Sequence, residues 1–183
     1  FIKQGKNTGG FARTGYSSVD NSSNTSVAYA GKSDDVQGMI LGNFQSGHQY
    51  ENQGSNYSTG INRTAPNPAD YRNWYVLSKA FLRIDSVNKL GITYESQNVT
   101  QNVNNLSDLS RAVATSTASD TTTRNRISGE YQYSDAGNAY IQTAKVMAYH
   151  QEASVTQNSF QGSALGGGRP VSYTHLTLPT NRE

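Results

Sequence analysis

The sequence predicts an all-β protein: part of an antiparallel transmembrane β-barrel, with about seven strands arranged as an open, curved meander. Three observations predict this fold. Gly, Ser, Thr, Asn and Tyr are common where Leu, Glu and Lys would be expected, which is the usage of strands and turns. Several segments alternate apolar and polar side chains with a period of two. The connections between these segments alternate between short and long.

The composition argues against both a helical bundle and a disordered chain. Hydrophobic residues make up only 34% of the chain, but charged residues are also scarce, at 15%, and there are 12 Tyr. Disordered chains combine low hydrophobicity with high charge and few aromatic residues. The longest apolar stretch, residues 36–42, is far shorter than the roughly 20 residues of a membrane-spanning helix. Any membrane span must therefore be made by strands.

Charge and residue usage also limit the function. Lys and Arg number 15 against 13 Asp and Glu, and they form no basic stripe, so we expect no nucleic-acid partner. The absence of Cys removes thiolate metal sites and cysteine nucleophiles. No Ser lies in a recognisable nucleophile motif, and no glycine-rich run matches a phosphate-binding loop. We therefore expect neither an enzyme nor a metal or cofactor bound by this chain itself.

Seven segments have the pattern of strands. Their expected ranges are 9–18, 25–33, 36–47, 71–84, 89–100, 121–133 and 139–152. The clearest is 71–84, in which Trp74 and Leu82 fall on one face while Lys79 and Arg83 fall on the other. This alternation predicts a sheet with one apolar face and one polar face.

The connections are expected to segregate by length. Residues 33–35, 85–88 and 134–138 have the composition of tight turns, whereas 49–70 and 101–120 are long loops. The connection after the first strand, of about six residues, is also one of the longer ones. Long strands with short turns at one edge and long loops at the other are typical of an outer-membrane barrel. The reason is that hydrocarbon offers no hydrogen-bond partners, so every backbone polar group must be paired within the sheet.

The two ends of the chain differ from its middle. The chain begins at Phe1 without an initiator Met or a leader segment, so we expect a fragment. Residues 161–170 form a glycine-rich end. Residues 171–183, VSYTHLTLPTNRE, resemble a translated sequencing adapter, so we expect an artefactual tail that makes no consistent contact with the strands.

Three stretches carry a resemblance to a known family. They are GKNTGGFARTGYSSVDNSSNTSVAYAG, DDVQGMILGNFQSGHQYENQG and RTAPNPADYRNWYVLSKAFLRI. Read in order, they resemble TonB-dependent outer-membrane receptors of the haemoglobin, transferrin and lactoferrin type, especially the haem and haemoglobin branch. The resemblance is strongest over about residues 5–95, and its most specific pieces are SGHQYENQG, residues 46–54, and NPADY, residues 67–71.

The resemblance implies both architecture and function. It implies a barrel of about 22 strands around a plug domain, with residues 1–8 at the junction between plug and barrel and 9–160 forming part of the barrel. It implies the cell outer membrane of a Gram-negative bacterium as the location and the outer-membrane lipid as a partner. The TonB complex would act through a plug that this chain does not include. Haem, taken from haemoglobin or a related haem carrier, would be the transported ligand of the intact receptor.

Two alternatives stay open. Within the same superfamily, the chain could come from a siderophore receptor or a transferrin or lactoferrin receptor. From another class, an extracellular β-sandwich adhesin or glycan-binding module would also be rich in Asn, Ser, Thr and Tyr. Such a sandwich would need a second sheet packed over a dry core.

The candidate ligand-binding residues lie in and beside the loop 49–70. They are His48, Tyr50, Tyr57 and Arg63. An imidazole or a phenolate could ligate ferric haem, but no second ligand is visible near His48, and the family's haem-ligating histidines map onto no residue of this chain. We therefore interpret His48 as a polar residue that hydrogen-bonds backbone at the start of the loop. The Tyr and Arg side chains are amphipathic anchors for a large ligand.

Overall fold

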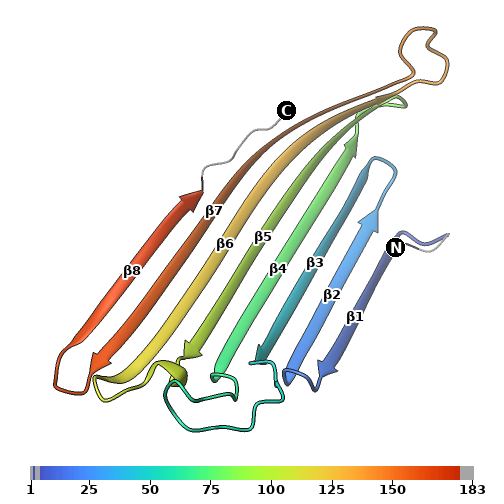
Figure 1. The fold of residues 1–183 in the computed structure, drawn as a ribbon. Helices are drawn as coiled ribbons and strands as arrows, with labels where there is room; N and C mark the ends of the chain where they lie inside the picture. Colours follow the sequence, from blue (N-terminus) through green and yellow to red (C-terminus); the bar gives the residue numbers. More distant parts are fainter. Residues whose placement is uncertain (1, 3–4, 178–183) are drawn as a thin grey trace.

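The structure is a single sheet of eight antiparallel strands (Figure 1). The computed structural model describes residue 2 and residues 5–177, and for residues 175–177 the backbone alone. The strands are β1 (Thr8–Ser17), β2 (Ser22–Lys32), β3 (Val36–His48), β4 (Ala69–Arg83), β5 (Asn88–Asn104), β6 (Val113–Ser134), β7 (Thr143–Ser163) and β8 (Gly168–Thr177). One 3-10 helix, η1 (Leu106–Asp108), is the only helical element in the described residues.

The topology is the predicted open meander. Each strand is hydrogen-bonded only to its neighbours in the sequence, in the order β1 to β8. The edge strands β1 and β8 do not pair with each other, and the described residues form no second sheet. The all-β fold class and the open, antiparallel arrangement are therefore confirmed.

No helix in the described part of the chain is long and apolar enough to cross a membrane.

The strand boundaries agree best where apolar and polar residues alternate. The strands expected at 36–47 and 71–84 are β3 and β4, displaced by at most two residues at either end. The strand expected at 121–133 is wrong at its start, because β6 begins at Val113. β7 likewise continues to Ser163 instead of ending at 152. Both added stretches are rich in Ser and Thr on both faces, so they lack the apolar alternation that marks a strand.

The expected lack of contact by the tail is wrong for residues 171–177. They belong to β8, which pairs with Ala153–Gly162 of β7. The physical reason is local: Gly166 and Gly167 have φ of 95° and 92°, a left-handed conformation that reverses the chain beside the free edge of β7. The remaining tail residues, 178–183, lie outside the described residues.

Short and long connections are less clearly separated between the two ends of the strands than expected. One edge of the sheet, named here the loop edge, carries the connections 18–21, 49–68, 105–112 and 164–167. The opposite edge, the turn edge, carries 33–35, 84–87 and 135–142. The predicted tight turn at 134–138 is wrong, since the connection continues to Gln142, whose carbonyl accepts a hydrogen bond from Asp135 N. The longest loop, 49–68, does lie at the predicted edge.

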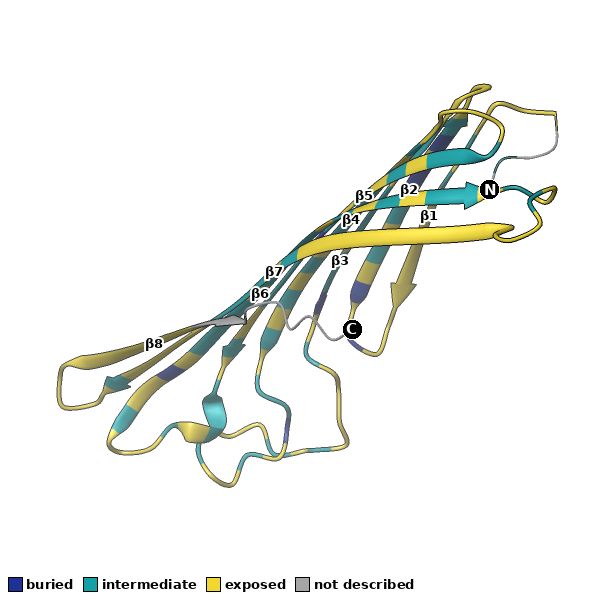
Figure 2. Cartoon of the chain, turned by 90° about the horizontal axis from the view of Figure 1, so that it is seen from above, coloured by how far each residue is buried: buried dark blue, intermediate teal, exposed yellow. Residues whose placement is uncertain are grey.

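The sheet buries almost no apolar side chain. The only buried hydrophobic residues in the described chain are Ala28, Ala30 and Ala65, and no large side chain is fully buried. Figure 2 shows exposed and half-exposed residues along every strand and few buried ones. A water-soluble domain of this size would cover one face of the sheet with another layer, so this sheet lacks the core that such a domain has.

Candidate functional site

The first candidate site is an apolar band on one face of the sheet. The register places Leu82 of β4 directly beside Val36 of β3 and Leu90 of β5. The band extends this row over neighbouring strands, with large side chains between 38% and 66% exposed: Tyr29, Val36, Ile40, Phe44, Trp74, Leu82, Leu90, Ile92, Tyr94, Ile127, Tyr131 and Val146. In β4 the band runs from Trp74 to Leu82, close to the about 9–11 residues of a transmembrane strand.

Beyond Trp74, toward the loop edge, the same face becomes polar. The outward side chains of β5 are Asn98, Thr100 and Asn102, and those paired with them on β6 are Thr123, Thr121 and Ser119. The face that carries the apolar band is therefore divided along the strands into an apolar half near the turn edge and a polar half near the loop edge.

The opposite face carries charges that are paired within the sheet. Lys145 Nζ lies 2.8 Å from Glu130 Oε2, and the Glu130 side chain is only 14% exposed. The Tyr75 hydroxyl donates a 3.2 Å hydrogen bond to Glu95, and the Arg126 guanidinium lies 4.5 Å from the centre of the Tyr149 ring. The charged face is thus more enclosed than the apolar one, which is the reverse of a soluble protein.

The second candidate site is the loop 49–68, which its own backbone closes. Asn56 N donates to Thr64 Oγ1 at 2.9 Å, and Thr64 N donates back to Asn56 O at 3.1 Å. A Cβ at Gly54 would lie 1.9 Å from Thr64 O, so the two arms of the loop touch through their backbones. Arg63 completes the closure by donating to the carbonyls of Tyr57 and Pro66, both at 2.7 Å.

The loop 49–68 is also fixed to the neighbouring loop 105–112. Asn67 Nδ2 donates to Ser107 Oγ at 2.9 Å, and Ser107 N donates to Asn67 Oδ1 at 3.1 Å. Gly60 N donates to Leu106 O at 2.8 Å. The two longest connections of the loop edge therefore form one ordered surface, with Tyr57 69% exposed and Ile61 94% exposed.

The structure brings the four sequence-predicted residues together in two pairs. His48, the last residue of β3, and Tyr50 line one cavity of about 550 Å³ between the loop and the charged face. Arg63 and Tyr57 are joined by the guanidinium-to-carbonyl bond. Tyr50 and Tyr57 are both about two-thirds exposed. Because the Arg63 guanidinium donates to loop carbonyls, Arg63 shapes the loop, and its role as a ligand anchor stays a prediction.

Sequence reasoning missed a polar pair beside this cavity. Tyr71 donates a hydrogen bond to Asp20, which is buried in the turn between β1 and β2. This bond is the largest of the effects that lower the pKa of Asp20. Gly47 lies under the Tyr71 side chain, where a Cβ would meet the ring at 2.8 Å. The glycine next to His48 was the available signal, since a glycine within a strand often marks a close approach.

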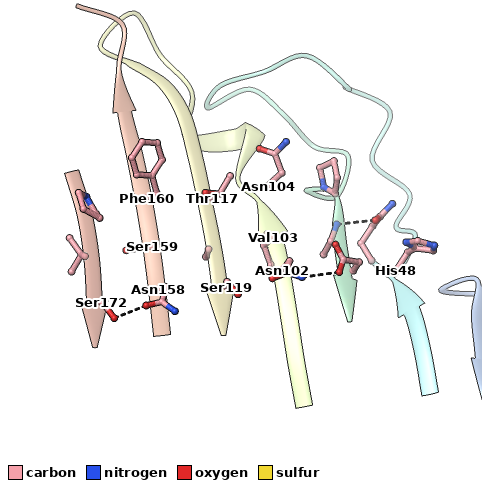
Figure 3. Close-up of a pocket in the computed structure, with 17 residues that line it drawn as sticks. His48, Asn102, Val103, Asn104, Thr117, Ser119, Asn158, Ser159, Phe160 and Ser172 are labelled. Carbon is pink, nitrogen blue, oxygen red and sulfur yellow. Dashed lines mark hydrogen bonds between the residues drawn. The ribbon is translucent and has the colours of Figure 1, made fainter. Parts of the chain in front are cut away.

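A third surface lies on the polar half of the banded face. The strand register aligns six side chains, one from each of β3 to β8, in a single row, named here the polar shelf: His48, Asp70, Asn102, Ser119, Asn158 and Ser172. They line an open cavity of about 650 Å³. Figure 3 shows the row, with Asn102 hydrogen-bonded to Asp70 and Ser172 to Asn158, and with Phe160 above it.

No group of three or more His, Asp or Glu in the described residues is placed to hold a metal ion. Comparison with known proteins gives no family: no family model matches the chain, and neither does any curated protein.

Proposed function

We propose that this chain is part of the barrel wall of a TonB-dependent outer-membrane transporter that takes up haem from haemoglobin or a related haem carrier. One observation carries the membrane part of the proposal: the apolar band is exposed, while the charged face of the same sheet is more enclosed. In water this arrangement is unfavourable, because each Å² of exposed apolar surface costs roughly 25 cal/mol. Against lipid tails the band has no such cost, and the charged face lines a polar interior.

The open edges of the sheet also favour a larger barrel. Among the described residues, β1 has a neighbouring strand on one side only, and so does β8. Unpaired backbone groups at such edges are costly in hydrocarbon. In the proposed transporter, further strands continue the sheet on both sides and close it.

The ligand part of the proposal rests on the resemblance to haem and haemoglobin receptors. Its most specific pieces, residues 46–54 and 67–71, lie at the two ends of the loop 49–68. Two features of this loop support a role in binding a protein ligand: it is held in one shape by its own hydrogen bonds, and it exposes Tyr50 and Tyr57. Aromatic side chains on a preorganised surface supply much of the binding energy at protein interfaces. The TonB complex would act through a plug that is not part of this chain.

The alternatives make different demands on the structure. A siderophore, transferrin or lactoferrin receptor would keep the same wall and differ at the loop edge. A β-sandwich adhesin requires a second sheet over the apolar face, and the described residues form one sheet only. This observation favours the membrane proposal over the sandwich.

The single tryptophan tests the membrane proposal. Trp74 lies in the apolar band and is 39% exposed. When the chain is folded into phosphatidylcholine vesicles, lipids brominated on their acyl chains should strongly quench Trp74 fluorescence. A matched control moves the reporter to the loop, as Trp74→Phe with Tyr57→Trp, and should be little quenched. Equal quenching of both reporters, or a monodisperse chain that unfolds cooperatively in water without lipid, would contradict the proposal.

A further inference from the structure

The polar shelf has a geometry that repeats once per strand. Adjacent strands lie about 4.8 Å apart, so the row from His48 to Asn158 presents one hydrogen-bonding side chain at each such step. Ser172 continues the row on β8, but it belongs to residues 171–183, which resemble a translated sequencing adapter, so it is not counted as part of the binding surface. This spacing is comparable to the length of one ring in a linear sugar chain. The side chains stand on paired strands, so their positions are fixed before any ligand binds.

The shelf keeps hydrogen-bonding capacity that the protein does not use. Asn102 Nδ2 donates to Asp70 at 2.9 Å, and Asn158 Oδ1 accepts from Ser172. Within the described residues, the other amide atoms, Asn102 Oδ1 and Asn158 Nδ2, make no hydrogen bond. Both side chains are exposed. Each amide therefore still offers one acceptor or one donor, and sugar hydroxyl groups can serve as both.

An aromatic side chain lies beside these amides. Phe160 is two residues along β7 from Asn158, on the same face of the sheet, and is 42% exposed. Its ring lines the same cavity as the shelf. An exposed aromatic ring next to amide groups offers an apolar surface for the C–H face of a sugar ring together with hydrogen bonds for its hydroxyls.

The charge of the surface selects between possible ligands. The shelf contains one carboxylate, Asp70. The next row toward the band contains one guanidinium, Arg72, followed by Thr100, Thr121 and Thr156. Binding of phosphate groups is typically built from clusters of Arg and Lys, and these two rows have a single Arg. The surface is therefore suited to an uncharged ligand.

We propose that the polar shelf binds an uncharged sugar chain carried by lipids of the leaflet that the apolar band adjoins. The proposal rests on the membrane function above, because the shelf is on the lipid-side face and lies directly beyond the band. In that position it meets the headgroup region of the same lipids whose tails contact the band.

The test measures which lipids remain around the protein. The chain is folded into vesicles of phosphatidylcholine containing a minor fraction of digalactosyl diacylglycerol, an uncharged glycolipid, and its bound lipids are counted by mass spectrometry after extraction. The wild-type chain should retain digalactosyl lipid above its bulk fraction. The double variant Asn102→Ala with Asn158→Ala should lower this enrichment about tenfold, since it removes two hydrogen-bonding amides.

The control variant carries the same number of changes on the same strands. Gln101→Ala with Gln157→Ala removes two amides from the opposite face, next to Asn102 and Asn158, and should leave the enrichment unchanged. Phe160→Ala should reduce enrichment without changing the strand content. Equal enrichment in the wild type and the Asn double variant would overturn the proposal, as would stronger retention of an anionic lipid, phosphatidylglycerol, used in place of the glycolipid.

Trp74 quenching by brominated chains in the same vesicles separates the two proposals. If Trp74 is quenched but the glycolipid is not enriched, the sugar proposal is wrong and the membrane function stands. If Trp74 is not quenched, the membrane function itself is wrong, and the sugar proposal fails with it.

Discussion

The Tyr71 hydroxyl donates a 2.6 Å hydrogen bond to Asp20 Oδ2, and this bond connects β4 to the turn between β1 and β2 over the intervening strands. The two residues are 51 positions apart in the sequence. Gln45 Nε2 donates to the same hydroxyl at 3.1 Å, so β3 joins the contact. This small polar cluster connects the first hairpin to the wall of the cavity under the loop 49–68.

The first prediction concerns pH. The pKa of Asp20 is lowered from its usual value of 3.8, chiefly by the Tyr71 hydrogen bond. A carboxyl with a lowered pKa in the folded state contributes stability above its unfolded pKa and loses that contribution as pH falls through its folded pKa. Tyr71→Phe should therefore weaken the loss of stability as pH falls below about 4, measured by urea unfolding in lipid. Tyr16→Phe, which removes a bond to the uncharged Asn21, is the control and should leave the pH profile unchanged.

The second prediction concerns space under Tyr71. A Cβ at Gly47 would lie 2.6 Å from Ser22 Cβ and 2.8 Å from the Tyr71 ring and hydroxyl, so Gly47→Ala must displace Tyr71 from Asp20. We expect a loss of about 1–3 kcal/mol in unfolding free energy. Gly42→Ala on the same strand is the matched control, because nothing lies within 4 Å of its new methyl group. Equal stability of the two variants would show that Tyr71 can shift without cost.

The third prediction concerns the loop 49–68. Arg63→Ala removes the bonds to the carbonyls of Tyr57 and Pro66, so the loop should open and become several-fold more sensitive to limited proteolysis. Arg111→Ala removes an exposed Arg from the neighbouring loop and should have little effect. If both variants are cleaved at the wild-type rate, Arg63 does not hold the loop together.

The fourth prediction compares two adjacent residues of β5 that point to opposite faces. Ile92 lies in the apolar band, whereas Thr93 lies on the charged face. In a membrane, Ile92→Arg should destabilise the folded chain by about 2–4 kcal/mol, while Thr93→Arg should cost much less. Folding titrations in lipid vesicles measure both values. Similar costs for the two variants would count against a lipid-facing band.

The fifth prediction concerns the ligand. If the chain belongs to the proposed transporter, deleting residues 52–66 from the full-length protein should weaken haemoglobin binding while the strands still assemble, because the deletion retains the Asn67–Ser107 pair. Binding to whole cells, with surface expression confirmed, is the measurement. Unchanged binding and unchanged growth on haemoglobin would make the loop assignment wrong.

His48→Ala tests whether this histidine is a polar residue at the start of the loop or an essential haem ligand. Its backbone N–H donates to Asp20 O at 2.8 Å, a bond that does not require the imidazole. We therefore expect His48→Ala to retain the use of free haem. Loss of growth on free haem from this change alone would show that the side chain is an essential ligand.

The sequence predicts this fold well where one face of the sheet is apolar and the other is mostly polar. In β3 and β4 one face carries the apolar band, and most side chains of the other face are polar, although Met39, Leu41, Leu77 and Phe81 also lie there. The predicted boundaries of both strands are close to the observed ones. The first part of β6, from Val113 to Asp120, lies beyond the band, where neither face needs apolar residues. Its Ser and Thr residues therefore have the pattern of a loop, although they form a strand.

The candidate site was predictable only in its location. His48 and Tyr50 could be placed beside the loop 49–68 because they follow a clear strand. The role of Arg63 depends on carbonyls that approach it only when the loop closes, and no local pattern encodes that. The contact between Tyr71 and Asp20 depends on the register of several strands, which the sequence leaves open.

The two arms of the loop 49–68 touch at Gly54, and this contact determines which positions of the loop can change their side chain. The part of the loop beyond Gly54 is closed by hydrogen bonds between Asn56 and Thr64 and by the Arg63 guanidinium, so its shape does not depend on the side chain at its tip, where Ile61 is 94% exposed. We therefore expect position 61 to accept other side chains without opening the loop. Gly54 has no such freedom, since even a methyl group would collide with Thr64 O. Within this loop, the exposed position 61 can therefore vary only as long as position 54 stays a glycine.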